Sequence, residues 1–251
     1  MTAGTATLDG RWALITGAGR RVGATIARTL HAHGAGIAIH YRASAQPARE
    51  LAAELEALRP GSTELVRADL LDVERLPAMV EEVVAKTRRL DILVNNASSF
   101  YPTPLGSVTT TQWDDLIGTN LRAPLFLSQA ALPHLRASGG VIVNLIDIHA
   151  IRPLRDHAVY GAAKAGLSML TRALARDLAP AVRVNGIAPG AVLWPDDGIA
   201  ESTRDSIVRQ IPMKRAGTPE DIAGCVLYLV RDASYVTGQV IVVDGGRSVG
   251  W

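Results

Sequence analysis

The strongest constraint on the fold is an alternation between short apolar runs and longer segments with helical spacing, which continues along the whole chain. Several of the runs are apolar at successive positions, as in parallel strands buried on both faces. The predicted strands are Trp12–Thr16, Gly36–Tyr41, Ser62–Ala68, Asp91–Asn95, Val141–Ile146, Val182–Ala188 and Gln239–Val243. The predicted helices are Arg21–His33, Ala45–Leu58, Val73–Arg89, Thr111–Arg136, Val159–Leu178 and Pro219–Val230. This alternation predicts an α/β protein with a doubly wound, seven-stranded parallel sheet.

Composition is typical of a folded globular protein. Hydrophobic residues make up 48% of the 251 residues and charged residues 20%. No low-complexity linker or repeat is present, so residues 1–251 are expected to form a single domain. The formal net charge is only +2 and no Lys/Arg-rich run occurs, which argues against a nucleic-acid partner.

The chain also lacks the signals of export, membrane insertion and metal binding. Met1–Gly10 does not resemble a signal peptide, and no apolar run has the length of a membrane span, so a cytoplasmic protein without a membrane partner is expected. Cys225 is the single cysteine, which excludes an internal disulfide. The histidines do not show ligand spacing with cysteine or carboxylate partners, so no metal is expected.

Two long irregular stretches are expected at the ligand-binding edge of the sheet. Ser98–Thr110 and Pro189–Ser206 each follow the carboxyl end of a predicted strand. Ligands of open α/β sheets bind at that edge. The two stretches are therefore predicted to form the substrate mouth.

A glycine-containing turn, Thr16–Gly23, joins the first predicted strand to the first predicted helix. Glycines let the backbone approach a pyrophosphate, and the amino end of a helix supplies N–H donors. The spacing differs from the usual GxGxxG dinucleotide fingerprint, and a purely conformational turn is the alternative interpretation. With the alternating pattern, the turn favours a Rossmann-type nucleotide-binding fold.

The end of the second predicted strand indicates the kind of nucleotide. It reads His40-Tyr41-Arg42-Ala43-Ser44, and no acidic residue occurs before Glu50. NAD-binding proteins usually place an acid there for the ribose 2′-hydroxyl, whereas a guanidinium and a hydroxyl suit a 2′-phosphate. Arg42 could instead be an ordinary solvated arginine. The position favours NADP(H).

Tyr160 and Lys164 are four residues apart at the start of a predicted helix, so they share a face. A lysine ammonium near a phenol favours the phenolate and is expected to lower the pKa of Tyr160. A tyrosine tuned in this way can donate a proton. The pair alone is a weak signal, but it follows the fifth predicted strand at the ligand-binding edge.

The chain resembles the short-chain dehydrogenase/reductase family over nearly its entire length. The motifs that carry this resemblance are Thr16–Gly23, Asn95-Asn96-Ala97, Asn120, Tyr160-x-x-x-Lys164, Pro189-Gly190 and Thr237-Gly238…Asp244-Gly245-Gly246. The resemblance implies that Tyr160 is the proton donor, that Lys164 binds the nicotinamide ribose and that Asn120 holds a relay water. The cofactor-binding residues implied or proposed are Gly17, Arg20, Arg21, Val22, Tyr41, Arg42, Ser44, Asp69, Leu70, Asn96, Ala97, Ser98, Tyr160, Lys164, Pro189 and Gly190.

Two departures resemble the pteridine reductase branch of that family. Most relatives carry glycine where this chain has Arg21, and serine where it has Asp147, thirteen residues before Tyr160. The segment 95–104, the pair His40-Tyr41 and the run Ala68-Asp69-Leu70 are also similar to that branch. The catalytic set is therefore Asp147, Tyr160, Lys164 and Asn120. The substrate-binding set is Arg21, Ser98, Phe100, Asp147, Tyr160 and Trp194.

An aspartate at position 147 suits a pterin better than a ketone. A carboxylate would repel the alkoxide that develops in ketone reduction, whereas a carboxyl group can supply a proton to the imine nitrogen of a dihydropterin. This role predicts an acidic pH optimum. The alternative is that Asp147 forms a surface ion pair with Arg152 or Arg155.

The resulting prediction is an NADPH-dependent reductase of dihydrobiopterin-like, dihydromonapterin or dihydrofolate substrates. One alternative is a 3-oxoacyl thioester or other carbonyl reductase on the same scaffold. Another is a non-catalytic NADP(H)-sensing protein. The family resemblance also implies a homotetramer.

Overall fold

The computed structural model describes residues 7–194, 198 and 200–249 and contains the predicted seven-stranded parallel sheet. The strands are β1 (Trp12–Ile15), β2 (Gly36–Tyr41), β3 (Thr63–Arg67), β4 (Ile92–Asn95), β5 (Val141–Leu145), β6 (Arg183–Pro189) and β7 (Val240–Val243). Their order is β3-β2-β1-β4-β5-β6-β7, and every neighbouring pair is parallel. The order reverses between β1 and β4, which places a ligand-binding crevice at the carboxyl ends of these strands. The expectation of one doubly wound domain is confirmed.

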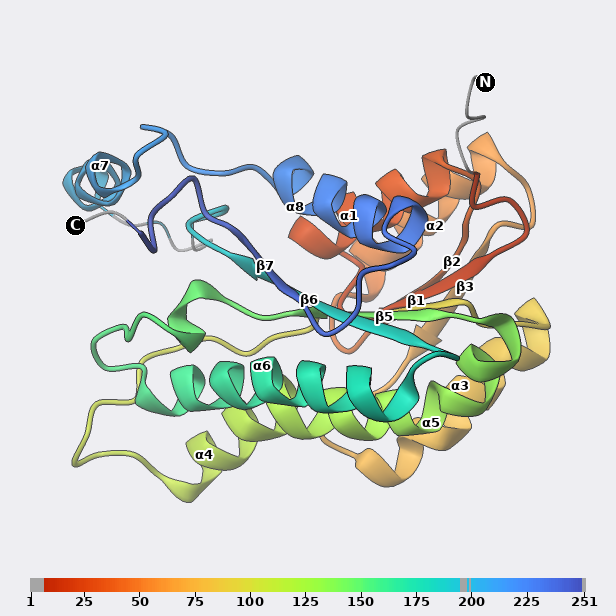
Figure 1. The fold of residues 1–251 in the computed structure, drawn as a ribbon, viewed down its shortest axis with the longest axis horizontal. Helices are drawn as coiled ribbons and strands as arrows, with labels where there is room; N and C mark the ends of the chain where they lie inside the picture. Colours follow the sequence, from red (N-terminus) through yellow and green to blue (C-terminus); the bar gives the residue numbers. More distant parts are fainter. Residues whose placement is uncertain (1–6, 195–197, 199, 250–251) are drawn as a thin grey trace.

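Helices cover both faces of the sheet (Figure 1). One face packs against α1 (Arg21–Ala32), α2 (Ala45–Leu58) and α8 (Pro219–Leu227). The other face is covered by η1 (Val73–Arg75), α3 (Leu76–Thr87), α4 (Thr110–Ile117), α5 (Ala123–Ser138) and α6 (Ala158–Leu178). Each face has its own large apolar core, as expected for strands buried on both sides. Within the described ranges, no helix is both long enough and apolar enough to cross a membrane.

The predicted helix Thr111–Arg136 is divided in the structure. A π turn, η2 (Gly118–Arg122), separates α4 from α5, and the N–H of Ala123 donates to the carbonyl of Gly118. Pro124 follows directly and has no N–H to donate, so the regular helical ladder cannot continue across it. The turn carries Asn120, and π turns of this kind are frequent at functional sites.

The predicted irregular stretch Pro189–Ser206 contains the start of a helix, α7 (Glu201–Gln210). Periodicity gave no sign of it because no residue of α7 is buried, so the helix has no apolar face. In Figure 1, α7 lies beside the carboxyl ends of the strands, next to the C-terminal segment. The other expected stretch, Ser98–Thr110, is irregular up to the start of α4.

Candidate active site

The carboxyl group of Asp147 faces the hydroxyl of Tyr160. Asp147 follows β5 and starts the short helix η3 (Ile148–Ala150), and Tyr160 lies in the first turn of α6. The Tyr160 hydroxyl donates to Asp147 Oδ2 at 2.8 Å, and the His149 N–H donates to Oδ1 at 2.8 Å. Arg155, one of the two arginines considered for a surface ion pair, is 95% exposed and lies 3.7 Å from Asp156. The carboxyl of Asp147 is thus directed into the predicted catalytic centre.

Lys164 lies one helical turn after Tyr160 and is buried. Its side-chain amine donates to the carbonyl of Leu145 at 2.8 Å and lies 5.7 Å from the centre of the Tyr160 ring. Burial lowers the pKa of Lys164 to about 8, and the charge of Asp147 opposes this shift. The ammonium is therefore held against the end of β5 and beneath the ring of Tyr160.

The expected lowering of the Tyr160 pKa is wrong for this arrangement. Burial raises the pKa of Tyr160 well above its usual value, and the charge and hydrogen bond of Asp147 raise it further. A hydrogen bond with Ser98 acts in the opposite direction. The direction of the Tyr160 pKa shift is therefore set by the low-polarity surroundings and by the carboxylate at the hydroxyl. The Tyr–Lys spacing alone suggested the opposite direction.

Asn120 is hydrogen-bonded to Ser98, a close neighbour of Tyr160. Ser98 donates its hydroxyl to Asn120 Oδ1 at 2.7 Å. The Asn120 amide donates to the carbonyls of Ser99 and Leu116, which fixes the orientation of the side chain. The Ser98 hydroxyl and the Asn120 side chain are thus held in fixed positions beside the Asp147–Tyr160 pair.

Successive side chains after β4 point to opposite sides of an extended segment. Phe100 is directed toward the catalytic group: its ring meets the ring of Tyr160 edge to face at 4.9 Å and stacks on His157 at 4.7 Å. Half of Phe100 is exposed, so its ring is accessible to a flat ligand. On the other side, Tyr101 donates to Asp115 at 2.9 Å, and burial with this bond raises the pKa of Tyr101 to about 12.

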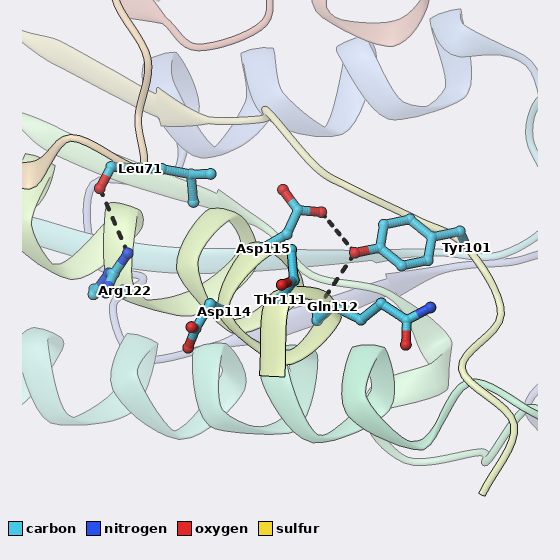
Figure 2. Close-up of a pocket in the computed structure, with 7 residues that line it drawn as sticks. All are labelled: Leu71, Tyr101, Thr111, Gln112, Asp114, Asp115 and Arg122. Carbon is cyan, nitrogen blue, oxygen red and sulfur yellow. Dashed lines mark hydrogen bonds between the residues drawn. The ribbon is translucent and has the colours of Figure 1, made fainter. Parts of the chain in front are cut away.

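Figure 2 shows the pocket on the Tyr101 side of this segment, which has a volume of about 470 Å³. Its lining residues are Leu71, Tyr101, Thr111, Gln112, Asp114, Asp115 and Arg122. None of them belongs to the predicted catalytic, cofactor-binding or substrate-binding sets. The hydrogen bonds in this region anchor the segment that carries Ser98 and Phe100.

The nucleotide turn is held by side chains from neighbouring strands. Gly17 has a φ of 63°, a value that favours glycine, and its N–H donates to His40 Nδ1. The Asn96 amide donates to the carbonyls of Thr16 and Gly17. A Cβ at Gly23 would lie 2.4 Å from the Gly17 carbonyl oxygen, so that position has no room for a side chain. Asn96 therefore fixes the turn itself, and Ala97 lies beside it, 3.2 Å from where a Cβ on Gly17 would be.

Arg21 begins α1 with a φ of 55°, a left-handed conformation that explains why glycine suits this position in relatives. Its guanidinium donates to the carbonyl of Trp194 at 3.1 Å, which joins the nucleotide turn to the second long loop. Arg20 precedes it as an exposed N-cap residue, and Val22 packs against the core. The structure thus brings Arg21 and Trp194 together at one side of the crevice.

The residues predicted at the adenosine end lie around the carboxyl ends of β2 and β3. Arg42 is more than half exposed and lies 3.8 Å from Asp69, while Tyr41 and Leu70 are buried. Ser44 lies close to the turn, with its hydroxyl 3.0 Å from where a Cβ on Gly19 would be. No acid occurs in the first turn of α1. The structure thus brings these predicted residues together at the carboxyl ends of β2 and β3.

Pro189 and Gly190 lie at the end of β6, near the expected nicotinamide position. The N–H of Gly190 donates to the carbonyl of Val243, and a Cβ on Gly190 would lie 2.7 Å from the Asp244 Cβ. This close contact between two strand ends accounts for the glycine. The cofactor, substrate and catalytic roles given to individual residues stay predictions.

Sequence reasoning missed the structural role of His40. Its Nδ1 accepts the Gly17 N–H and its Nε2 lies 3.2 Å from the carbonyl of Ala68. Burial lowers the pKa of His40 to about 4, so the ring is neutral and can accept at one nitrogen and donate at the other. His40 thereby links the ends of three strands, a contact that no spacing along the chain could indicate.

The pKa of Lys164 gives a pH dependence. Because the pKa is about 8, the ammonium is present below pH 8 and is lost as the pH rises through it. We expect kcat/KM to fall by about tenfold per pH unit above that point, since the charge near Tyr160 is needed. The measurement is the initial rate from pH 6 to 10 at a saturating concentration of the reduced nicotinamide cofactor. In Lys164→Arg, whose side chain stays charged, kcat/KM is expected not to fall above pH 8. A wild-type kcat/KM that stays constant to pH 10 would contradict a role of the Lys164 charge in catalysis.

Comparisons with known proteins agree with this geometry. The family profile described as enoyl-(acyl carrier protein) reductase matches residues 17–248. Pteridine reductase 1 of Leishmania tarentolae is 37% identical, with 94% of this chain and 96% of the relative covered. A 3-oxoacyl-(acyl-carrier-protein) reductase of Staphylococcus aureus is also 37% identical, with 93% and 96% covered.

A solved structure is similar over almost the whole chain. It is described as a putative short-chain alcohol dehydrogenase from Sinorhizobium meliloti 1021, with a TM-score of 0.92, 34% identity, and coverage of 98% of this chain and 99% of that one. The fold, the profile and these relatives point to one family, whose members use NAD(P)(H). The chain belongs to the short-chain dehydrogenase/reductase family and is an oxidoreductase.

Proposed function

We propose that this protein is an NADPH-dependent pteridine reductase that converts dihydropterins or dihydrofolate-type substrates to their tetrahydro forms. The observation that supports this most directly is the 2.8 Å hydrogen bond between the Tyr160 hydroxyl and Asp147 Oδ2. In most relatives a serine is expected at position 147. A carboxylate at position 147 changes the sign of the developing substrate charge that the site can stabilise.

The sign of the charge that develops on the substrate separates the two reaction types. Ketone reduction builds negative charge on oxygen, and a carboxylate beside Tyr160 would repel it. A dihydropterin imine becomes positively charged when its ring nitrogen is protonated, and the same carboxylate stabilises that charge. The centre with Asp147 therefore favours an imine.

The residues of the chain have distinct tasks in this reaction. NADPH supplies the hydride when bound. Asp147 and Tyr160 hold the proton next to the accepting nitrogen, and Asn120, which accepts the Ser98 hydroxyl, positions a relay water. Lys164 keeps positive charge beneath Tyr160, and Phe100 offers its accessible ring for stacking of the pterin. Arg21 and Trp194 close one side of the substrate position.

The deciding experiment is a substrate panel with purified protein and NADPH. Dihydrobiopterin, dihydromonapterin, dihydrofolate and an acetoacetyl thioester are compared by NADPH oxidation and by product analysis. We expect turnover of at least one dihydropterin with kcat/KM well above that of the thioester. Turnover of the thioester alone would contradict the proposal.

A 3-oxoacyl thioester reductase is the second candidate. It is favoured by the 3-oxoacyl-(acyl-carrier-protein) reductase relatives, which are as similar as the pteridine reductase at 37% identity. The charge at position 147 counts against it. A cofactor-sensing protein without catalysis is disfavoured because both Tyr160 and Lys164 are present.

The proposed preference for NADPH depends on Arg42. Arg42→Ala is expected to lower the ratio of kcat/KM with NADPH to that with NADH by about 10- to 100-fold, because a charge-assisted bond to the 2′-phosphate is lost. Steady-state rates with both cofactors measure this ratio. Arg49→Ala, which removes an exposed arginine of α2, is the matched control. An unchanged ratio in Arg42→Ala would mean that Arg42 is merely solvated.

The proposal includes a homotetramer that works in the cytoplasm. Exposed apolar side chains on the neighbouring helices α5 and α6, Leu125, Phe126 and Met169, support association between copies. The mass in solution, measured by light scattering, tests the tetramer.

A further inference from the structure

The imidazole of His149 faces the carboxyl oxygen of Asp147 that Tyr160 does not use. The Tyr160 hydroxyl donates to Asp147 Oδ2, whereas His149 Nε2 lies 4.0 Å from Asp147 Oδ1. The backbone N–H of His149 also donates to Oδ1, at 2.8 Å, so the carboxyl group cannot turn away from the ring without losing this bond. The Asp147 carboxyl therefore lies between the hydroxyl of Tyr160 and a histidine ring.

The tautomer of the neutral His149 ring follows from a second contact. Its Nδ1 lies 2.9 Å from the backbone carbonyl of Arg152, and a carbonyl oxygen can only accept a hydrogen bond. Nδ1 therefore carries the hydrogen, and Nε2 is the nitrogen that gains and loses a proton. Histidine ordinarily changes its charge between about pH 5 and 8. The titrating nitrogen of His149 is thus the one that faces Asp147.

The backbone on both sides of His149 keeps this ring in place. The N–H of Arg152 donates to the carbonyl of Ile148 at 2.9 Å, which closes the turn that brings the Arg152 carbonyl to the ring. A Cβ on Gly161 would lie 3.3 Å from the His149 carbonyl oxygen, so η3 rests on α6 directly after Tyr160. The His149 side chain is 13% exposed, so the ring is confined but still has access to water.

The cations near this ring have other contacts. The Lys164 ammonium donates to the carbonyl of Leu145, and the Arg152 guanidinium donates to the carbonyl of Arg247. Among the described residues, the carboxylate within ion-pair distance of His149 is that of Asp147. A proton held by the His149 ring therefore has Asp147 as its acceptor.

Each turnover of the proposed reaction removes one proton from the Asp147–Tyr160 pair. The ring nitrogen of the product keeps that proton, so the pair must be protonated again before the next turnover. A dihydropterin that stacks on Phe100 beside Tyr160 would cover the side of the pair that opens to the crevice. His149 adjoins the other carboxyl oxygen of Asp147, on the side of η3.

We propose that His149 returns a proton to Asp147 after each turnover. This inference rests on the proposed pteridine reductase function and adds a proton supply to it. The Nε2–H bond of the imidazolium breaks and an O–H bond forms on the Asp147 carboxylate; at 4.0 Å, this transfer requires a small rotation of the ring or one bridging water molecule. The neutral ring then takes a proton from solvent. Because His149 acts through Asp147 and does not meet the reacting atoms, it is a positioning residue.

The test uses His149→Asn and His149→Ala with the dihydropterin that wild type reduces fastest. An asparagine amide can still donate to the Arg152 carbonyl, as Nδ1 does, but it has no group that titrates. In dilute buffer, both variants are expected to lower kcat by about tenfold or more with KM little changed, because the proton supply becomes limiting. Added imidazole should restore kcat of His149→Ala in a saturable manner.

His134→Asn is the matched control, because His134 also lies beside a carboxylate, that of Glu81, but outside the candidate site. Its kcat should equal that of wild type and should not depend on imidazole. In an Asp147→Asn background, His149→Asn should cause no further loss, since no carboxylate is left to protonate. A further loss as large as that in the wild-type background would contradict an action through Asp147.

A wild-type kcat in His149→Asn would assign the ring a structural role alone and overturn the inference. A loss in His149→Ala that imidazole does not restore would overturn it as well. If His149→Ala does not fold, His149→Asn decides: its kcat should rise with the concentration of phosphate buffer while that of wild type stays constant, and a kcat that does not rise overturns the inference. Failure of wild type to reduce any dihydropterin overturns the proposed function instead, so the two failures are distinguishable.

Discussion

Tyr160→Phe is expected to lower kcat by about 10²- to 10⁴-fold, the usual contribution of a positioned proton donor. The substitution removes only the hydroxyl, which donates to Asp147 Oδ2. The ring stays in place against Phe100 and above Lys164, so the fold and the cofactor site should be unaffected. Single-turnover rates of NADPH oxidation with dihydropterin measure the loss.

Tyr101→Phe is the matched control for that variant. Tyr101 lies in the neighbouring segment and its hydroxyl binds Asp115, outside the predicted catalytic group. It should keep nearly normal turnover, and both variants should bind NADPH with wild-type affinity in a fluorescence titration. Normal dihydropterin turnover by Tyr160→Phe would show that the Tyr160 hydroxyl takes no part in the chemistry.

The sequence predicted the sheet and the order of the site residues for clear physical reasons. Strands that are apolar at every position, such as β1, are expected to be buried on both faces, which requires helices on both sides. The four-residue spacing of Tyr160 and Lys164 places both on one face of α6 whatever surrounds them. Asp147 could be located because it follows β5 at the edge where the carboxyl ends of parallel strands meet.

The features that escaped prediction depend on contacts between distant segments. The pKa of Tyr160 is set by burial and by Asp147, neither of which the Tyr–Lys spacing contains. The hydrogen bond from Arg21 to the carbonyl of Trp194 joins two loops that lie 173 residues apart in the chain. The helix α7 has no buried face, so the hydrophobic pattern could not reveal it. Local periodicity therefore predicts elements, while the electrostatics of the site require the assembled structure.

Asp147→Asn is expected to lower kcat/KM for dihydropterin by about 10²- to 10³-fold, because the charge that stabilises the protonated imine is removed while the shape of the side chain is kept. The Tyr160 pKa should fall in this variant, since the charge of Asp147 raises it. The lower pKa of Tyr160 makes it a stronger proton donor to a developing alkoxide, and the absence of the carboxylate removes a charge that would repel this alkoxide. Reduction of an acetoacetyl thioester should therefore be unchanged or faster, and more so in Asp147→Ser.

The opposite response of the two substrates is what makes this variant decisive. A loss caused by misfolding or by weaker cofactor binding would lower both rates together, whereas the charge argument requires them to diverge. Asp156→Asn, in the same loop, is the control: asparagine tolerates the left-handed φ of 60° at that position, and both rates should stay at the wild-type level. If Asp147→Asn keeps full dihydropterin activity, the carboxylate has no role in protonating the ring, and the pterin assignment loses its physical basis even though the chain would still be a reductase.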